Sequence, residues 1–173
     1  MRLLPYLFLL ISIWACYSNV PIPDNLELLH LYEADQADRE VEDIDWGYVF
    51  PRDQQRRARV TELLDSNKVI TSADCYNAAM VFQHGSDSIA YGTAVRLMRK
   101  AIELDPSRDK SLLAAAIDRD LVSRDKPQIY GTQFFQMIGE PWIQRDIDTT
   151  QVTDAERLEY GVKTLAEQRE QLR

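Results

Sequence analysis

The sequence contains few of the residues that build cross-linked or metal-centred proteins. Its 173 residues include 2 cysteines and 2 histidines. Two cysteines cannot form a disulfide-rich scaffold, and two histidines restrict any metal site to one that relies on carboxylates. Glycine and proline are also sparse, at 6 and 7 residues, which excludes collagen-like and low-complexity chains. The composition is that of an ordinary globular protein.

The sequence also lacks several catalytic motifs, and it contains fewer positive than negative charges. The chain has no Gly-x-Ser-x-Gly elbow, no His-Glu-x-x-His pair, no Cys-x-x-Cys and no glycine-rich phosphate loop. We therefore expect no metal site and no cofactor. Lysine and arginine number 20 against 28 aspartates and glutamates, which gives a formal charge of −8. This acidic balance argues against a nucleic-acid partner.

The long apolar run of the chain lies at its N-terminus. Leu3 to Ala15 is apolar apart from Ser12, and as a helix it spans about 20 Å, less than the roughly 30 Å of a bilayer core. This length favours a signal peptide over residues 1–15. The run ends in Ile-Trp-Ala-Cys, which resembles the bacterial lipobox and makes Cys16 the expected lipidation site. The alternatives are an ordinary secretory signal or a short uncleaved anchor.

Lipidation of Cys16 predicts where the protein acts. We expect a lipoprotein carrying palmitate-type chains, exported to the periplasmic face or surface of the bacterial cell envelope and held at the membrane by its lipid. Residues 16–24 contain two prolines and no helical period, which indicates a short stiff tether. Residues 25–173 are expected to form one domain. Cys75 is then left without a partner, so we expect it to be buried as a small apolar residue.

The spacing of apolar residues after Asp24 is mostly helical. It predicts a mostly α fold, a compact bundle of about five or six helices with one short β-hairpin around residues 139–141. The stripe from Ala90 to Ile102 and the apolar run 112–117 predict a helical hairpin, and residues 94–107 resemble the closing half of a single tetratricopeptide repeat. An aromatic turn is expected at Trp46–Pro51, and one last helix is expected to run from Thr153 past Leu165.

Polar residues interrupt the apolar faces of these helices. Asp35 and Arg39 continue a stripe that begins with apolar residues, and Asp118 and Arg119 interrupt the helix that contains residues 112–117. A charged side chain on an apolar face must be paired or take part in function. A structural pair of Arg119 with Asp118 or Asp35 and a role in binding both remain open here. The arginines at 52, 56, 57 and 59 are interpreted as a solvated face, rather than as contacts to anionic lipid.

The interrupted pattern is similar to that of a family of small bacterial proteins whose domain has no known function. The resemblance covers nearly all of residues 25–170 and rests on short polar segments. These are Asp35-x3-Arg39, Asp74 with Ala78-Ala79, Gln83-His84-Gly85, Asp118-Arg119-x-Leu121, Pro127-Gln128-x-Tyr130-Gly131-Thr132-Gln133 and Asp154-x2-Arg157-x3-Gly161. The resemblance implies no activity, substrate or cofactor. It implies that these polar residues belong together.

Two hypotheses follow for this set of residues. The first is a helical binding or interaction module with a polar cleft for a small anionic or amide-bearing ligand or a peptide end. The second is a hydrolase or transferase. His84 is either a cap for the end of its helix or an acid/base group. The candidate catalytic residues are His84, Arg119 and Tyr130, and the candidate binding residues are Asp35, Arg39, Gln83, Asp118, Gln128, Thr132 and Gln133.

The lipid anchor predicts a simple chemical result. Replacing Cys16 with Ser removes the thiol that carries the acyl chain, so Cys16→Ser should abolish labelling of the protein by a fatty-acid analogue supplied to the cells. Gel fluorescence after coupling of a dye to the analogue measures this labelling. Labelling that persists in Cys16→Ser would refute the lipobox interpretation.

Overall fold

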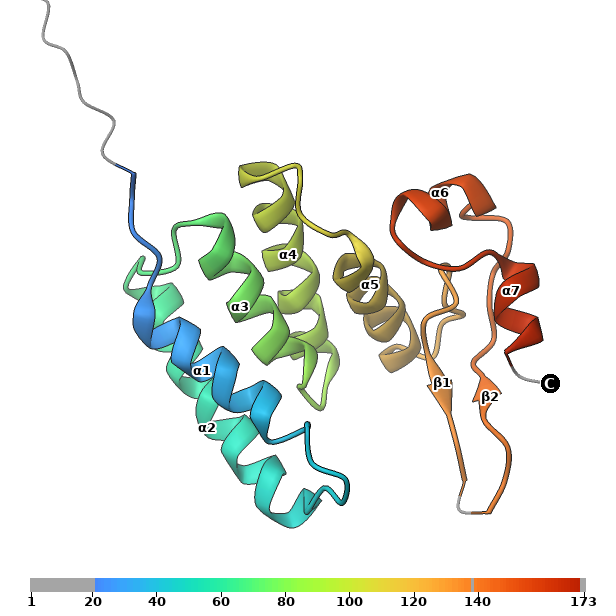
Figure 1. Cartoon of the computed structure of the whole chain (residues 1–173), viewed down its shortest axis with the longest axis horizontal. Helices are drawn as coiled ribbons and strands as arrows, with labels where there is room; N and C mark the ends of the chain where they lie inside the picture. The colour runs from blue at the N-terminus through green and yellow to red at the C-terminus, as the bar shows by residue number, and fades with distance from the viewer. Residues whose placement is uncertain (1–20, 138, 172–173) are drawn as a thin grey trace, which may run out of the picture.

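The computed structural model describes residues 21–137 and 139–171, so the expected signal peptide and Cys16 lie outside it. This part of the chain is mostly helical, with seven helices and a two-stranded antiparallel sheet (Figure 1). The predicted mostly α fold with a short β-hairpin is confirmed. None of the described helices is long and apolar enough to cross a membrane. The elements are α1 (Leu26–Ala37), α2 (Trp46–Asp65), α3 (Ser72–Gln83), α4 (Ser88–Leu104), α5 (Ser111–Ser123), β1 (Phe134–Phe135), β2 (Ile143–Gln144), α6 (Asp154–Glu159) and α7 (Leu165–Glu170).

Side-chain caps define where most helices begin. Asn25, Asp45 and Asp87 accept hydrogen bonds from the first backbone N–H groups of α1, α2 and α4. Thr71 and Thr153 form the two capping boxes that the sequence predicts, and Thr164 forms a third. The sequence therefore specifies the helix starts locally, through the N–H groups that a helix leaves without a partner.

Two boundaries differ from the prediction. The aromatic turn expected at Trp46–Pro51 is wrong, because Asp45 caps a helix that already begins at Trp46. Pro51 lies near the start of this helix, where its missing N–H removes a single bond. The last helix expected to pass Leu165 is also wrong. Gly161 takes a left-handed φ of 67° after α6, and a new helix begins at Leu165, which contributes to a count of seven helices instead of five or six.

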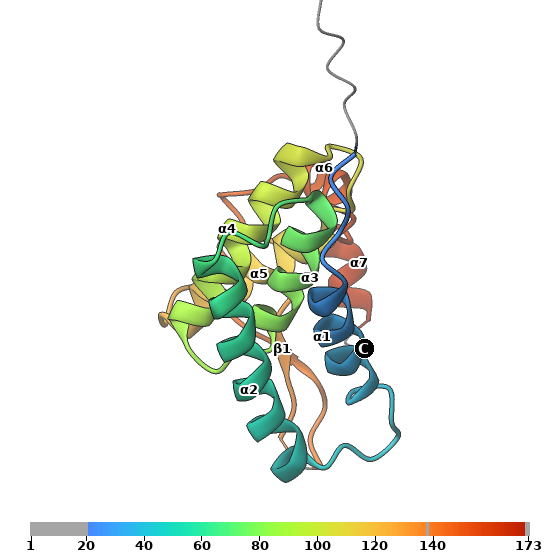
Figure 2. The same cartoon turned by 90° about the vertical axis from the view of Figure 1, so that its left-hand side faces the viewer.

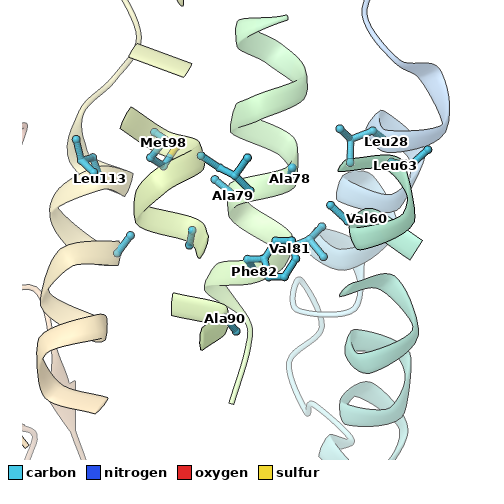
Figure 3. Packing of buried hydrophobic residues seen from close by; sticks show 13 residues of the cluster. Leu28, Val60, Leu63, Ala78, Ala79, Val81, Phe82, Ala90, Met98 and Leu113 are labelled. Atoms are coloured by element: carbon cyan, nitrogen blue, oxygen red, sulfur yellow. The ribbon is translucent and has the colours of Figure 1, made fainter. Parts of the chain in front are cut away.

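Helix α3 is the centre of the main hydrophobic core. Figure 3 shows Ala78 and Ala79 of α3 between Met98 and Leu113 on one side and Leu28 and the α2 residues on the other. The small alanines let α1, α4 and the neighbouring helices approach α3 closely, which raises packing density. Burial of α3 on nearly all sides fixes its C-terminal end, where Gln83 and His84 lie.

A second, smaller core joins the C-terminal third of the chain to α5. Ala114 of α5 packs with Tyr130 and Val152, and the ring of Tyr130 stacks on that of Tyr160 with centroids 5.0 Å apart. Phe134 pairs with Gln144 and Phe135 with Ile143 in the small sheet. The hairpin and the last two helices therefore cover the side of α5 that faces away from α4 (Figure 1).

Gly85 is needed because two helices approach each other closely. A Cβ atom at this position would lie 2.2 Å from Ala90 Cβ and 2.9 Å from the Phe82 carbonyl oxygen. Its φ lies outside the left-handed region, so the turn requires Gly85 for its lack of a side chain. Gly92 lies inside α4, and a Cβ atom added to it would make only ordinary contacts at 3.5 Å.

These two glycines predict opposite effects of the same substitution. Gly85→Ala should lower the free energy of unfolding by about 1–3 kcal/mol, because overpacking forces the backbone to shift. Gly92→Ala should raise it by about 0.5–1 kcal/mol, because alanine is the better helix former. Urea unfolding followed by circular dichroism measures both. Equal effects in the two variants would contradict the close approach at Gly85.

Candidate functional site

Asp35 is the centre of a buried ion-pair network between α1 and α2. Its side chain is fully buried and accepts a hydrogen bond from Arg39 Nη1 at 3.2 Å. Arg39 also reaches across to α2, where Nη2 lies 2.5 Å from Asp53 Oδ2. Gln36 donates to the other Asp35 oxygen at 2.8 Å. The predicted i, i+4 pair is confirmed, and it is part of a larger array.

Arg56 completes this network from α2. It pairs with Asp38 at 2.6 Å and with Asp53 at 2.8 Å, and its side chain is almost fully buried. Burial raises the pKa of Asp53, but the bonds from Arg39 and Arg56 outweigh this effect and hold that pKa below its usual range. The interpretation of the α2 arginines as a solvated face is therefore wrong for Arg56.

His84 extends the network to the end of α3. Its Nδ1 lies 2.7 Å from Asp35 Oδ2, and no described residue makes a hydrogen bond to its Nε2. The last carbonyls of α3 are capped by other groups, because Arg57 donates to the His84 carbonyl and Arg119 donates to the Gln83 carbonyl, at 2.9 and 2.8 Å. The His84 ring is thus held by a buried carboxylate, with its second nitrogen left for another partner.

Arg119 has a different environment from the other buried arginines. Its Nε donates to Gln133 Oε1 at 3.0 Å and its Nη1 donates to the Gln83 carbonyl. No carboxylate of the described residues forms an ion pair with it, so the possible pair with Asp118 or Asp35 is not formed. Burial lowers the pKa of the Arg119 guanidinium; Tyr91, whose ring centroid lies 5.9 Å from the guanidinium carbon, raises it, and the positive charge of Arg39 lowers it further. The charge of Arg119 is positioned by neutral groups.

Asp118 binds the backbone of the segment that follows α5. Its fully buried carboxylate accepts the N–H groups of residues 129–132 at 2.8–2.9 Å and the Thr132 hydroxyl at 2.9 Å. Arg157 donates hydrogen bonds to the carbonyl oxygens of Ile129 and Tyr130 in the same segment. One buried carboxylate and one buried guanidinium thus supply hydrogen-bond partners to the backbone N–H and C=O groups of an irregular segment that belongs to no strand or helix.

Gln128 and Gln133 connect this ordered segment to Arg119. Gln128 is fully buried and binds both backbone groups of Gln133, because its Oε1 accepts from the N–H at 2.8 Å and its Nε2 donates to the carbonyl at 3.0 Å. The Gln133 amide donates to the Ala115 carbonyl and to the Thr132 hydroxyl. These bonds fix the direction in which Gln133 Oε1 faces Arg119.

A cleft of about 350 Å³ opens where these groups meet. Three of the predicted site residues line it, namely Arg39, His84 and Arg119, together with Asp53, Gly85 and the apolar side chains of Ile44, Trp46 and Phe50. Trp46 and Phe50 stack with ring centroids 5.3 Å apart, and 46% and 62% of their surfaces remain exposed. The cleft therefore combines cationic and imidazole groups with an aromatic wall.

The other predicted residues lie behind the cleft. Asp118, Gln128, Thr132 and Gln133 hold the backbone or Arg119 and do not line it, and Gln83 contributes its backbone carbonyl. The Gln83 side-chain oxygen is buried without a hydrogen-bond partner among the described residues. Tyr130 does not line the cleft either. It belongs to the second core, where burial raises the pKa of its hydroxyl.

The arrangement suits anion binding and proton transfer better than metal binding. Across residues 21–137 and 139–171, no three His, Cys, Asp or Glu side chains form a group that would hold a metal ion, and arginines already surround Asp35, Asp38 and Asp53. A guanidinium with unused donors binds carboxylate or phosphate oxygens. An imidazole oriented by a carboxylate accepts or donates a proton at its second nitrogen.

Helix α2 contributes to this site in a way that the predicted site residues do not include. The predicted solvated face includes Arg56, the predicted turn includes Trp46 and Phe50, and Asp53 is not among the predicted site residues. A signal was present, because Asp35, Asp38 and Arg39, at the end of α1 and just beyond it, match Arg52, Asp53 and Arg56 of α2 in number and opposite sign. Two such complementary triplets indicate an ion-pair network between the end of α1 and α2.

Comparison with known proteins identifies a family but no characterised relative. The model of a family of unknown function (DUF6624) matches residues 23–173. No curated protein matches the chain. No solved structure matches it either.

The Asp118 contacts predict a large effect from a small substitution. Asp118→Asn replaces one acceptor oxygen with an NH₂ group that faces N–H donors, so it should lower the free energy of unfolding by about 1–3 kcal/mol. Asp120→Asn is the matched control on the same helix. It removes a partly exposed pair with Arg124 and should change stability by at most about 0.5 kcal/mol. Urea unfolding of both variants tests this, and equal small losses would refute the structural role of Asp118.

Proposed function

Because the chain belongs to this family of unknown function, its role must be argued from the cleft, and we propose that it is a lipid-anchored bacterial envelope protein that binds a small anion. The ligand would lie in the cleft that Arg39, His84 and Arg119 line. The observation that carries this proposal is the environment of Arg119. A partly buried guanidinium without a carboxylate partner is costly to maintain, and an anionic ligand would compensate the charge.

The cleft also supports a statement about the size and chemistry of the ligand. A volume of about 350 Å³ lies at the lower end of small-molecule sites. Trp46 and Phe50 offer exposed ring surface on the same cleft. A small carboxylate that carries an apolar or aromatic group would use both features, with its charge at Arg119 and its apolar part on the aromatic wall.

The lipid anchor fits the position of the cleft. The first described residues lead into the N-terminal end of α1, whereas the cleft lies near the C-terminal end of α1 and the start of α2, at the opposite end of the helices (Figure 1). An acyl chain on Cys16 would therefore hold the molecule with its cleft directed away from the membrane. The acidic domain would be repelled by an anionic membrane surface, so the lipid would supply the attachment.

A hydrolase is the second candidate, and the contact between His84 and Asp35 favours it. A buried carboxylate on Nδ1 fixes the tautomer with its proton on that nitrogen, which leaves Nε2 as a base. With an anionic ester in the cleft, Nε2 would take a proton from a water molecule that attacks the carbonyl carbon. The bond to the leaving alcohol oxygen would then break, and that oxygen would receive the proton.

Benzoate tests the binding proposal, with benzamide as its neutral isostere. Saturation-transfer NMR on the full chain should detect benzoate and not benzamide. Arg119→Met should weaken benzoate binding at least about tenfold, as expected for loss of a charge-assisted contact, and should change stability by no more than about 1 kcal/mol. Lys126→Met removes one exposed positive charge outside the cleft and should leave binding unchanged.

Three results would contradict or redirect the proposal. Equal signals from benzoate and benzamide, or full binding by Arg119→Met, would refute anion binding at Arg119. Turnover of the mono-4-nitrophenyl ester of succinate that is lost in both His84→Ala and Arg119→Met would show an active site instead of a binding site.

A further inference from the structure

A second concave surface lies at the other end of the helices from the cleft. It is a groove of about 860 Å³ between the C-terminal end of α2, the loop that follows it and the outer face of α4. Figure 2 shows this loop and the upper end of α2 beside α4. Its apolar lining comes from Leu64, Val69, Ile70, Val95 and Leu97, with the buried Cys75 among them. We refer to it as the α2/α4 groove.

The rim of the α2/α4 groove carries three cations and one carboxylate, Glu103. Arg96, Arg99 and Lys100 are exposed and lie at i, i+3 and i+4 on α4, so they share one helix face. Lys100 pairs with Glu103 at 2.9 Å. Arg96 and Arg99 form no ion pair with any described carboxylate. In a protein with a net charge of −8, this leaves two uncompensated cations beside an apolar lining.

We propose that the α2/α4 groove binds a long-chain fatty acid. The hydrocarbon chain would lie on the apolar lining, which removes its surface from water, and the carboxylate would lie at Arg96 and Arg99. A short anion would leave the lining exposed, and a neutral lipid would leave the two cations without a partner. This proposal is independent of ligand binding in the cleft, because the α2/α4 groove shares no lining residue with it.

The position of the residues that lead into α1 supports this choice of ligand. Asn25 donates to the Lys68 carbonyl at 3.0 Å, and Thr71 donates to the Asp24 carboxylate at 2.6 Å. The first described residues therefore lie beside the loop that lines the α2/α4 groove. A lipid on Cys16 would place this end of the molecule toward the membrane, where long-chain fatty acids partition.

Photo-crosslinking tests the proposal on the purified full chain, kept in octyl glucoside. The probe is a palmitate analogue with a diazirine in its chain, and peptide mass spectrometry locates the adducts. We expect adducts within residues 64–75 and 92–103 that excess unlabelled palmitate removes. Arg96→Glu combined with Arg99→Glu should reduce labelling at least tenfold. Lys126→Glu combined with Arg169→Glu makes the same change in charge elsewhere and should leave labelling intact.

Several outcomes would overturn this assignment. Adducts spread over the surface, or adducts that palmitate does not displace, would show no specific site. Equal labelling of the Arg96→Glu, Arg99→Glu variant with an unchanged melting temperature would remove the role of the cations, as would equal labelling by the corresponding diazirine alcohol. Labelling of this region that appears only in Cys16→Ser would show that the lipid of the chain itself occupies the groove.

Discussion

The candidate site depends on how Arg119 is held. Its guanidinium is fixed by an amide oxygen and a helix-end carbonyl, Gln133 Oε1 and Gln83 O, and not by a carboxylate. Neutral acceptors orient a cation without cancelling its charge, so the charge remains available to a ligand. The contrast with Arg39 and Arg56 is direct, because each of these is neutralised by aspartates within the same molecule.

Much of the remaining polar structure serves to maintain this arrangement. Asp118 and Arg157 order the segment after α5, Gln128 binds both backbone groups of Gln133, and Gln133 directs Arg119. On the other side, Asp35 holds His84 at the end of α3. The two sets meet at the last turn of α3, whose burial in the core keeps its end in place. Asp118 therefore orders the segment that leads to Gln133 and Arg119, although it does not line the cleft.

The sequence was sufficient where the signals are local. Capping boxes at Thr71 and Thr153, the apolar stripe of α4 and the polar interruptions at Asp35 and Arg119 all depend on neighbours within a few residues. It was insufficient where the deciding partner is distant. The segment 129–132 is 11–14 residues from the carboxylate that binds it, and His84 is 49 residues from Asp35. The turn predicted at Trp46–Pro51 is wrong because the cap at Asp45 begins a helix there, and Tyr130, a predicted site residue, packs in the second core instead.

Arg119 is a cation that lines a cleft and that no carboxylate of the described residues neutralises. A crystal structure of the protein soaked in bromide, with anomalous scattering used to locate the ions, measures this most directly. We predict a bromide ion at the Arg119 guanidinium within the cleft lined by His84 and Trp46, with Asp35 and Asp53 still bound to Arg39. A carboxylate side chain turned onto Arg119, or a cleft without bromide while other surface cations bind it, would contradict the account.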